Sequence, residues 1–209
     1  MKFDSIIFDL DGTIWDSAET CTEGWNMALK EMPQYERQLK TEEIRSVMGK
    51  TLNEIEDIIF ADIEPKEKRT AARKKCTECQ MKVLAKKGGN LYPNVEETLK
   101  KLSENYKLFI VSNCENGYLD AFFTAHKLNK YFTDYEYWER THLSKAENIR
   151  IVMERNCLEN PVYVGDTPHD ALSANSAGIP FIHASYGFGK VDSEKYAVLE
   201  NFEDLLHIM

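Results

Sequence analysis

Two aspartates stand two positions apart after the first apolar run of the chain. Residues 3–10 are typical of a short buried strand, and this run leads into the letters DLDGT at positions 9–13. Because side chains alternate along a strand, the carboxylates of Asp9 and Asp11 could face one crevice, where they would repel each other unless a cation lay between them. Magnesium prefers such oxygen ligands, so the pair indicates a magnesium site.

Two simpler structures compete with this interpretation. A solvated turn suits any isolated Asp-x-Asp-Gly sequence. A calcium-binding loop would need glycine and glutamate at its sixth and twelfth positions, where this chain has Ile14 and Thr20, so the spacing excludes it. The solvated turn therefore remains an alternative unless other segments supply groups that would complete a magnesium site.

Three later segments supply a hydroxyl, a lysine and two further acids. In chain order they are Ser112 with Asn113 after a second apolar run, Lys145 within a capping-box pattern, and Asp166 with Asp170 in the letters GDTPHD. Each segment alone has a plain explanation as a turn, a helix cap, a solvated lysine or an acidic loop. A lysine is unfavourable in the first turn of a helix, however, so an anion near Lys145 would explain its position.

The elements that position these residues follow from the periodicity of apolar side chains. Residues 15–87 have apolar positions at three- and four-residue steps without a strand-like interruption, which predicts an all-helical insert. Beyond it, expected strands at 107–111, 162–164 and 179–182 alternate with expected helices at 95–105, 118–129, 148–156 and 170–177. This alternation predicts an α/β fold, a Rossmann-like parallel sheet with helices on both faces, plus an inserted all-helical cap domain.

The predicted division of the chain places residues 1–14 and 88–209 in a discontinuous catalytic core and residues 15–87 in the cap. Ligands of open parallel sheets bind beyond the carboxyl ends of the strands, so the four polar segments are expected at one edge of the core sheet. If these polar residues served no common site, four separate segments would have acquired carboxylates, a hydroxyl and a lysine at the same edge by chance.

Composition and charge restrict the class of protein. A hydrophobic content of 43% over 209 residues fits a packed globular chain, and the net charge of -9 argues against a general nucleic-acid or membrane-surface binder. No stretch approaches the roughly 18 apolar residues of a membrane span, and the first residues do not resemble a signal peptide. The five cysteines indicate reduced thiols, and Cys76 and Cys79 have no second pair for a zinc site. We therefore expect a cytoplasmic protein that is a monomer or homodimer.

Taken together, the polar segments resemble the motifs of the haloacid dehalogenase superfamily of phosphohydrolases, in the phosphoglycolate phosphatase-like branch with a helical C1-type cap. The matching letters are DLDGT at 9–13, SN at 112–113, the lysine at 145 and GDTPHD at 165–170, and they span nearly the whole chain in the family order. Residues 91–93 resemble the usual re-entry segment after the cap. The chain departs from many relatives at Ala146, where they have proline, and at Asn94, where they have glycine; neither change removes a reacting group.

The resemblance implies a magnesium-dependent phosphatase that acts on a small phosphorylated metabolite. Asp9 would be the nucleophile that forms an aspartyl-phosphate, and Asp11 would be the general acid and then the base. Ser112, Asn113 and Lys145 would bind the transferring phosphoryl group. The implied metal ligands are Asp9, Asp11, Asp166 and Asp170, the last of them directly or through another ligand.

The resemblance also implies that the helical insert acts as a lid over the site. Lys50, in the letters MGKT at 48–51 between two expected helices, is a candidate for substrate recognition, with a solvated lysine in a turn as the alternative. His169 matches no motif role and is expected to be exposed.

Other functions stay open on the sequence. A phosphomutase of the beta-phosphoglucomutase type keeps both aspartates, whereas dehalogenases and phosphonate-cleaving relatives lack the second, so Asp11 argues against those two. A non-catalytic phospho-accepting regulatory domain also clusters aspartates, a hydroxyl and a lysine around magnesium, but such domains are short and place the acceptor later in the chain. A degenerate binding protein is disfavoured because every reacting position is intact. Phosphoglycolate, a nucleoside monophosphate, a sugar phosphate and pyrophosphate all remain possible substrates.

Overall fold

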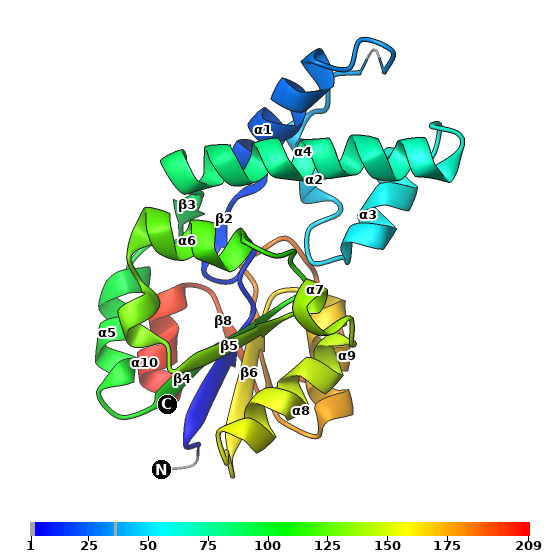
Figure 1. The fold of residues 1–209 in the computed structure, drawn as a ribbon. Helices are drawn as coiled ribbons and strands as arrows, with labels where there is room; N and C mark the ends of the chain where they lie inside the picture. Colours follow the sequence, from blue (N-terminus) through cyan, green and yellow to red (C-terminus); the bar gives the residue numbers. More distant parts are fainter. Residues whose placement is uncertain (1–2, 36) are drawn as a thin grey trace. The chain divides into compact units, whose positions relative to one another are not determined.

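The computed structural model describes residues 3–35 and 37–209 (Figure 1). Contacts divide the chain into two compact units. The first unit takes in the residues up to Asp16 together with Leu91–Asn113 and Leu128–Met209, and the second takes in Ser17–Asn90 and Cys114–Lys127.

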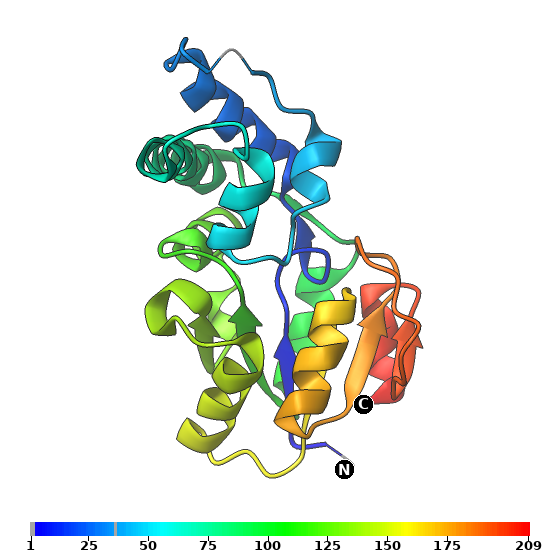
Figure 2. The same cartoon turned by 90° about the vertical axis from the view of Figure 1, so that its right-hand side faces the viewer.

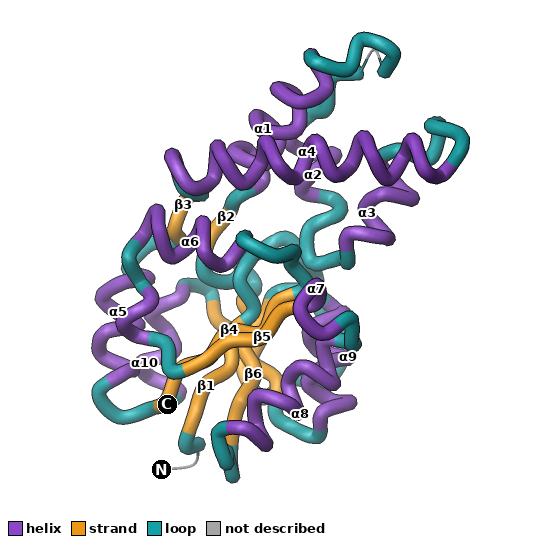
Figure 3. Tube along the Cα trace, in the orientation of Figure 1, coloured by secondary structure: helices purple, strands orange, loops and turns teal. Residues whose placement is uncertain are grey.

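The first unit is built on a six-stranded parallel sheet, and Figure 3 draws the strands in orange. The strand order is β5-β4-β1-β6-β7-β8. The strands are β1 (Ser5–Phe8), β4 (Lys107–Ser112), β5 (Asp134–Tyr137), β6 (Pro161–Gly165), β7 (Phe181–Ala184) and β8 (Ala197–Leu199). From β1 the chain adds β4 and then β5 on one side, and afterwards places β6 on the other side of β1. The order therefore reverses at β1, which is where open α/β sheets bind ligands.

Helices cover both faces of this sheet. Figure 1 shows α8 (Lys145–Arg155) and α9 (Pro168–Ala177) on one face, and α5 (Val95–Ser103) with α10 (Leu205–Ile208) on the other. Alternate strand residues point to opposite faces, so a buried cluster forms with α8 and α9 from Ile7, Phe109, Val111, Tyr163, Ile149, Val152, Ala171 and Ala174. A parallel sheet covered on both faces needs such apolar central strands, and the predicted fold class is confirmed.

Two strands of the sheet, β5 and β8, were not predicted from the periodicity. They form the two edges of the sheet. β5 has the letters DYEY with three of its four residues half-buried, and β8 has only three residues. An edge strand pairs on one side and needs no continuous apolar run, so its composition resembles that of a loop. The shorter elements of the chain are β2 (Trp15–Asp16), β3 (Asn90–Leu91), α7 (Trp138–Thr141) and 3-10 turns at Asn129–Tyr131 and Phe202–Asp204.

The second unit consists of helices (Figure 2). They are α1 (Ala18–Lys30), α2 (Thr41–Arg45), α3 (Leu52–Ile59), α4 (Lys66–Lys87) and α6 (Tyr118–His126). α1 and α4 pack closely at Gly24, where a Cβ atom would lie 2.5 Å from the Cα of Gln80, so no side chain fits there. α4 is 22 residues long but strongly charged, and across the described ranges no helix is both long enough and apolar enough to cross a membrane.

Helix α6 and the loop before it group with the second unit, because the Tyr118 hydroxyl lies 2.7 Å from Ser17 Oγ and α6 packs against α4. The cap assigned to residues 15–87 stays a prediction, and the contact grouping differs from it by joining residues 114–127 to the helices.

Candidate active site

The predicted site residues of the first unit stand where neighbouring strands end. Asp9 follows β1, Ser112 is the last residue of β4, and Asp166 follows β6. Both β4 and β6 pair with β1 in parallel register. The backbone N–H of Asp9 continues this pairing by donating to the carbonyl oxygen of Val164 at 2.8 Å. Sheet topology thus brings segments from three parts of the sequence to one edge.

Lys145 is the first residue of α8, and its side chain is fully buried. Its Nζ lies 3.0 Å from Oδ1 of Asp9 and 2.6 Å from Oδ1 of Asp170. Burial acts to lower the pKa of Lys145, but the charges of Asp170 and Asp9 outweigh it and hold that pKa well above its ordinary value. These two anions explain why a lysine occupies the first turn of the helix, where the Ser144 side chain provides the cap.

Asp9, Asp166 and Asp170 form a buried group of carboxylates. Among the described residues, each of the three offers one oxygen, and these oxygens lie within 4.8 Å of one another. Oδ2 of Asp9 and Oδ1 of Asp166 are buried without a hydrogen-bond partner, which is costly unless something else binds them. Two hard oxygen donors held in this way suit a divalent cation such as Mg²⁺.

Asp170 differs from the other two acids because its oxygens are already bonded. Oδ1 accepts from Lys145 Nζ at 2.6 Å, and Oδ2 accepts from both the backbone N–H of Thr167 at 2.9 Å and its Oγ1 at 2.6 Å. Thr167 is the N-cap of α9, and Asp170 completes its capping box. The structure therefore favours Asp170 as the residue that holds Lys145, and favours Asp9 and Asp166 as donors to a cation.

Burial and mutual repulsion shift the pKa values of these acids. Burial, followed by the charge of Asp170, raises the pKa of Asp9 from 3.8 to about 7 despite the neighbouring Lys145. Burial, followed by the charges of Asp170 and Asp9, raises the pKa of Asp166 to about 8. Burial acts in the same direction on Asp170, but the charge and hydrogen bond of Lys145 outweigh it and lower that pKa. Without a cation, Asp9 and Asp166 are therefore not both fully ionised at neutral pH.

These pKa values predict a pH-dependent affinity for Mg²⁺. Asp9 and Asp166 must lose their protons to bind the ion, so the affinity should rise from about pH 6 to about pH 8.5, by up to about tenfold per pH unit for each proton displaced. The metal-free protein should show the opposite trend: both pKa values exceed the ordinary 3.8, so its free energy of unfolding should fall as pH rises from 3.8 toward the raised values of about 7 and about 8, and should level off above them. Calorimetric titration of Mg²⁺ at several pH values and metal-free denaturation curves measure both trends.

The control for this prediction is Asp166→Asn, which cannot supply an anionic oxygen and should bind Mg²⁺ weakly at every pH. A wild-type affinity that stayed constant over this pH range would contradict the prediction.

Asp11 is also buried, with 8% of its surface exposed, and it bridges to Trp15 in the turn after β1. Its carboxylate is outside the group of three acids that share the potential cation site among the described residues. The assignments of Asp11 as general acid and base and as metal ligand therefore stay proposals. Ser112 and Asn113 are buried at the end of β4, and their assignment to phosphoryl binding stays a proposal.

Two predicted positions are exposed. Lys50 belongs to the second unit and lies in the turn before Thr51, the N-cap of α3, so its assignment to substrate recognition stays a proposal. His169 is exposed in the first turn of α9, as predicted.

The loop after β7 contacts the site and was not predicted. The backbone N–H of Phe188 donates to Oδ2 of Asp166 at 2.7 Å, and the Tyr186 hydroxyl donates to the carbonyl oxygen of Thr13 at 2.8 Å. The letters SYGFG at 185–189 directly follow a strand and contain two glycines. That pattern at a carboxyl strand end was the available signal, because glycine permits close backbone approach.

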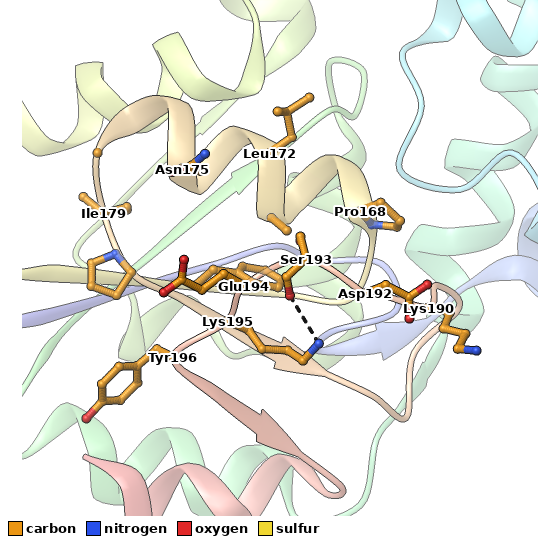
Figure 4. A pocket seen from close by; sticks show the side chains of 14 residues that line it. Pro168, Leu172, Asn175, Ile179, Lys190, Asp192, Ser193, Glu194, Lys195 and Tyr196 are labelled. Atoms are coloured by element: carbon orange, nitrogen blue, oxygen red, sulfur yellow. Dashed lines mark hydrogen bonds between the residues drawn. The ribbon is translucent and has the colours of Figure 1, made fainter.

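A cavity of about 920 Å³ lies in the first unit, between α9 and the segment at residues 190–196 (Figure 4). Its lining includes Leu172, Ile179 and Tyr196, and it includes none of the buried carboxylates. Lys195 spans part of this segment by donating to the carbonyl oxygens of Val191 at 2.8 Å and Ser193 at 3.3 Å. The candidate active site is thus the polar group at the strand ends and not this cavity.

Comparison with known proteins agrees with the fold and the motifs. A family model described as haloacid dehalogenase-like hydrolase matches residues 6–184. Curated relatives include the phosphoglycolate phosphatase of Photorhabdus laumondii, 26% identical over 97% of this chain and 90% of the relative, and that of Salmonella typhimurium, 27% identical over 96% and 90%.

Solved structures share the fold over the full length of the chain. A predicted phosphoglycolate phosphatase from Haemophilus somnus superposes with a TM-score of 0.85 at 22% identity, covering 100% of this chain and 98% of that one. A haloacid dehalogenase-like family protein from Streptococcus pneumoniae superposes with a TM-score of 0.84 at 22% identity, covering 99% and 98%.

Proposed function

Because this chain belongs to the haloacid dehalogenase-like hydrolase family, we propose that it hydrolyses a small phosphate monoester through an aspartyl-phosphate formed on Asp9. The family match and the relatives named phosphoglycolate phosphatase confirm the expected enzyme class, a phosphatase. We further propose a mechanism, a metal ion and a class of substrate for this phosphatase.

One observation carries the proposed mechanism. Lys145 is fully buried against Asp9 and Asp170, and one oxygen on each of Asp9 and Asp166 is buried with no partner. The buried positive charge of Lys145 can bind an anion, and the two unpaired carboxylate oxygens can bind a cation. A phosphoryl group with its divalent cation supplies that combination.

The residues fit a divalent cation, and we assign Oδ2 of Asp9 and Oδ1 of Asp166 as its protein ligands. Mg²⁺, when bound, would neutralise charge on the transferring phosphoryl group and keep Asp9 ionised. Asp170 holds Lys145 in place through the 2.6 Å contact, with its second oxygen fixed by Thr167. Ser112 and Asn113 would bind the phosphoryl oxygens from the end of β4.

The first step is phosphoryl transfer to the protein. Oδ1 of Asp9, which lies 3.0 Å from Lys145 Nζ, attacks phosphorus, and the bond between phosphorus and the leaving oxygen breaks. Asp11 donates its proton to the leaving oxygen, so the alcohol departs neutral. Lys145 remains charged and stabilises the negative charge that accumulates between Asp9 and the phosphoryl group.

The second step returns the protein to its starting state. Asp11, now ionised, removes a proton from a water molecule whose oxygen attacks phosphorus. The bond between phosphorus and Asp9 breaks, and inorganic phosphate leaves. Asp11 ends protonated and Asp9 ends as a carboxylate, so both residues are ready for the next cycle.

A panel of phosphorylated metabolites tests this function. We expect phosphate release from at least one member with Mg²⁺ present, and none after chelation with EDTA. The panel should include phosphoglycolate, because curated relatives along nearly the whole chain carry that name, together with nucleoside monophosphates, sugar phosphates and pyrophosphate. Conversion of a hexose 1-phosphate into its 6-phosphate without phosphate release would favour the mutase, and protein phosphorylation without turnover would favour the regulatory domain.

Substrate recognition by Lys50 gives a separate prediction. Lys50→Ala should raise KM several-fold for a carboxylate-bearing phosphate while leaving the KM of a generic aryl phosphate unchanged, because only the former loses a charge partner. The matched control is Lys82→Ala, which removes an exposed lysine from α4 of the same unit. A KM that does not change for any substrate would remove Lys50 from the site.

A further inference from the structure

The loop at residues 185–189 is held by the sheet of the first unit. Ser185 donates twice to the carbonyl oxygen of Leu199 in β8, through its N–H at 3.0 Å and its Oγ at 2.8 Å. The N–H of Gly187 closes a turn onto the carbonyl oxygen of Ala184 at 3.1 Å. The loop is therefore a fixed extension of β7 that meets the acidic group from one side of the sheet.

This loop makes the two oxygens of Asp166 different, because it forms a hydrogen bond with only one of them. Oδ2 accepts the backbone N–H of Phe188 at 2.7 Å, whereas Oδ1 is buried and has no hydrogen-bond partner. A carboxylate held by one oxygen has its rotation restricted, so the other oxygen keeps a constant direction. The backbone bond thus leaves Oδ1 as the oxygen presented to the cation.

Glycines surround Asp166 where any side chain would collide with it. A Cβ atom at position 187 would lie 2.3 Å from the carbonyl oxygen of Gly12 and 2.4 Å from Cβ of Asp166. A Cβ atom at position 189 would lie 2.6 Å from the carbonyl oxygen of Asp166, and one at position 12 would lie 2.1 Å from Asp166 Oδ2. The loop can reach Asp166 only because these three positions carry no side chain.

The same loop also contacts the segment that follows the nucleophile. Tyr186 donates its hydroxyl to the carbonyl oxygen of Thr13 at 2.8 Å, and its ring packs against that of Tyr92 with 4.6 Å between centroids. The loop therefore forms hydrogen bonds with both segments that carry the acids: with Thr13, which follows Asp9 in the sequence, and with Asp166 itself.

We propose that residues 185–189 act as a metal-positioning clamp, in which the Phe188 amide orients Asp166 and the Tyr186 hydroxyl sets the segment that carries Asp9. This inference rests on the proposed function, because it takes Asp9 and Asp166 as the cation ligands. Tyr186, Gly187 and Gly189 are positioning residues: they act through the ligands and do not touch the substrate. Their replacement should therefore weaken Mg²⁺ binding before it affects substrate binding.

Mg²⁺ affinity of the full chain, measured by calorimetric titration without substrate, tests the clamp. Gly187→Ala should weaken Mg²⁺ binding by about 10–100-fold, the usual effect of disturbing a residue that orients a ligand. Tyr186→Phe keeps the ring and removes one hydrogen bond, so it should weaken binding several-fold. In activity assays, both variants should recover kcat at high Mg²⁺ and keep the KM for substrate close to wild type.

Gly178→Ala is the matched control within the same unit. Gly178 has a positive φ of 81°, but a Cβ atom at this position would meet nothing within 4 Å, so alanine there adds backbone strain without touching Asp166. It should lower the melting temperature and leave Mg²⁺ affinity unchanged. A second control, Gly24→Ala, introduces a backbone collision between α1 and α4 and should likewise leave Mg²⁺ affinity unchanged.

Wild-type Mg²⁺ affinity in folded Gly187→Ala and Tyr186→Phe would overturn the clamp and leave the phosphatase proposal standing. If Gly187→Ala does not fold, Tyr186→Phe alone decides. A wild-type protein that binds Mg²⁺ but releases no phosphate from any substrate would overturn the phosphatase proposal and leave the clamp to be judged by binding. Absence of Mg²⁺ binding in the wild type would overturn the clamp.

Discussion

Turnover is expected to fall by at least about 10⁴-fold when Asp9 is replaced by asparagine, which corresponds to about 5.4 kcal/mol of lost transition-state stabilisation. The amide has nearly the size of the carboxylate but cannot form the aspartyl-phosphate, so both proposed steps are blocked. The measurement is kcat for the best substrate of the metabolite panel with saturating Mg²⁺.

Loss of folding would not explain such a result. Burial raises the pKa of Asp9 to about 7, so at pH 8 the ionised carboxylate costs stability in the metal-free protein, and the neutral amide removes that cost. Lys145 also contacts Asp170 at 2.6 Å, and this second anionic partner is not changed by the substitution. The melting temperature of metal-free Asp9→Asn at pH 8 should therefore not fall below that of the wild type. Substantial turnover by a folded Asp9→Asn protein would overturn the mechanism.

Asp11→Asn is expected to lower kcat by about 10²–10⁴-fold, the usual contribution of a positioned general acid and base. The loss in the first step should be smallest for an aryl phosphate, whose leaving oxygen needs little help from a proton. The second step should stay slow for every substrate, because no base activates the water molecule.

The two steps can be separated in this variant. An aryl phosphate should give a burst of about one equivalent of phenol, and intact-mass analysis should show protein carrying one added phosphoryl group. The double variant with Asp9→Asn, which lacks the acceptor, is the control and should show neither signal. If Asp11→Asn turned over aryl and alkyl phosphates at wild-type rates, Asp11 would not be the acid and base.

The pair of substitutions also separates the enzyme from its alternatives. A regulatory domain would accept a phosphoryl group on Asp9 without rapid turnover in the wild type, so Asp11→Asn would change little. A mutase would be phosphorylated and would pass the group to a second sugar hydroxyl instead of water. Only the phosphatase predicts fast phosphate release in the wild type, no phosphorylated protein in Asp9→Asn, and slow release from a phosphorylated protein in Asp11→Asn.

The grouping of the candidate site residues was readable from residue types at strand ends. Asp9, Ser112 and Asp166 each follow an apolar run, and the rule that parallel strands bind ligands at their carboxyl ends was sufficient to group them. The unfavourable place of Lys145 in a helix start left two explanations, a nearby anion or a solvated lysine, and the buried Asp9 and Asp170 supply the anions.

The edges of the fold were not readable in this way. β5 and β8 pair on one side only, so their short or polar sequences carry no apolar run to mark them. Helix α6 was expected among the elements of the core, but it groups with the helical unit through contacts such as that of Tyr118 with Ser17. Contacts between residues a hundred positions apart leave no local pattern.

By itself, the sequence determined the parallel α/β fold class, because that depends on local periodicity, and it predicted the helical insert and the candidate reacting groups from periodicity and side-chain chemistry. The tertiary structure decided which carboxylate oxygens are bonded and which are not. Asp170 has both oxygens bonded and holds Lys145, whereas Asp9 and Asp166 each keep one free buried oxygen. It also decided that the Phe188 amide donates to Asp166, since a backbone N–H leaves no trace in residue type. Which oxygen of a carboxylate is free depends on its spatial neighbours, and those neighbours come together only when the chain has folded.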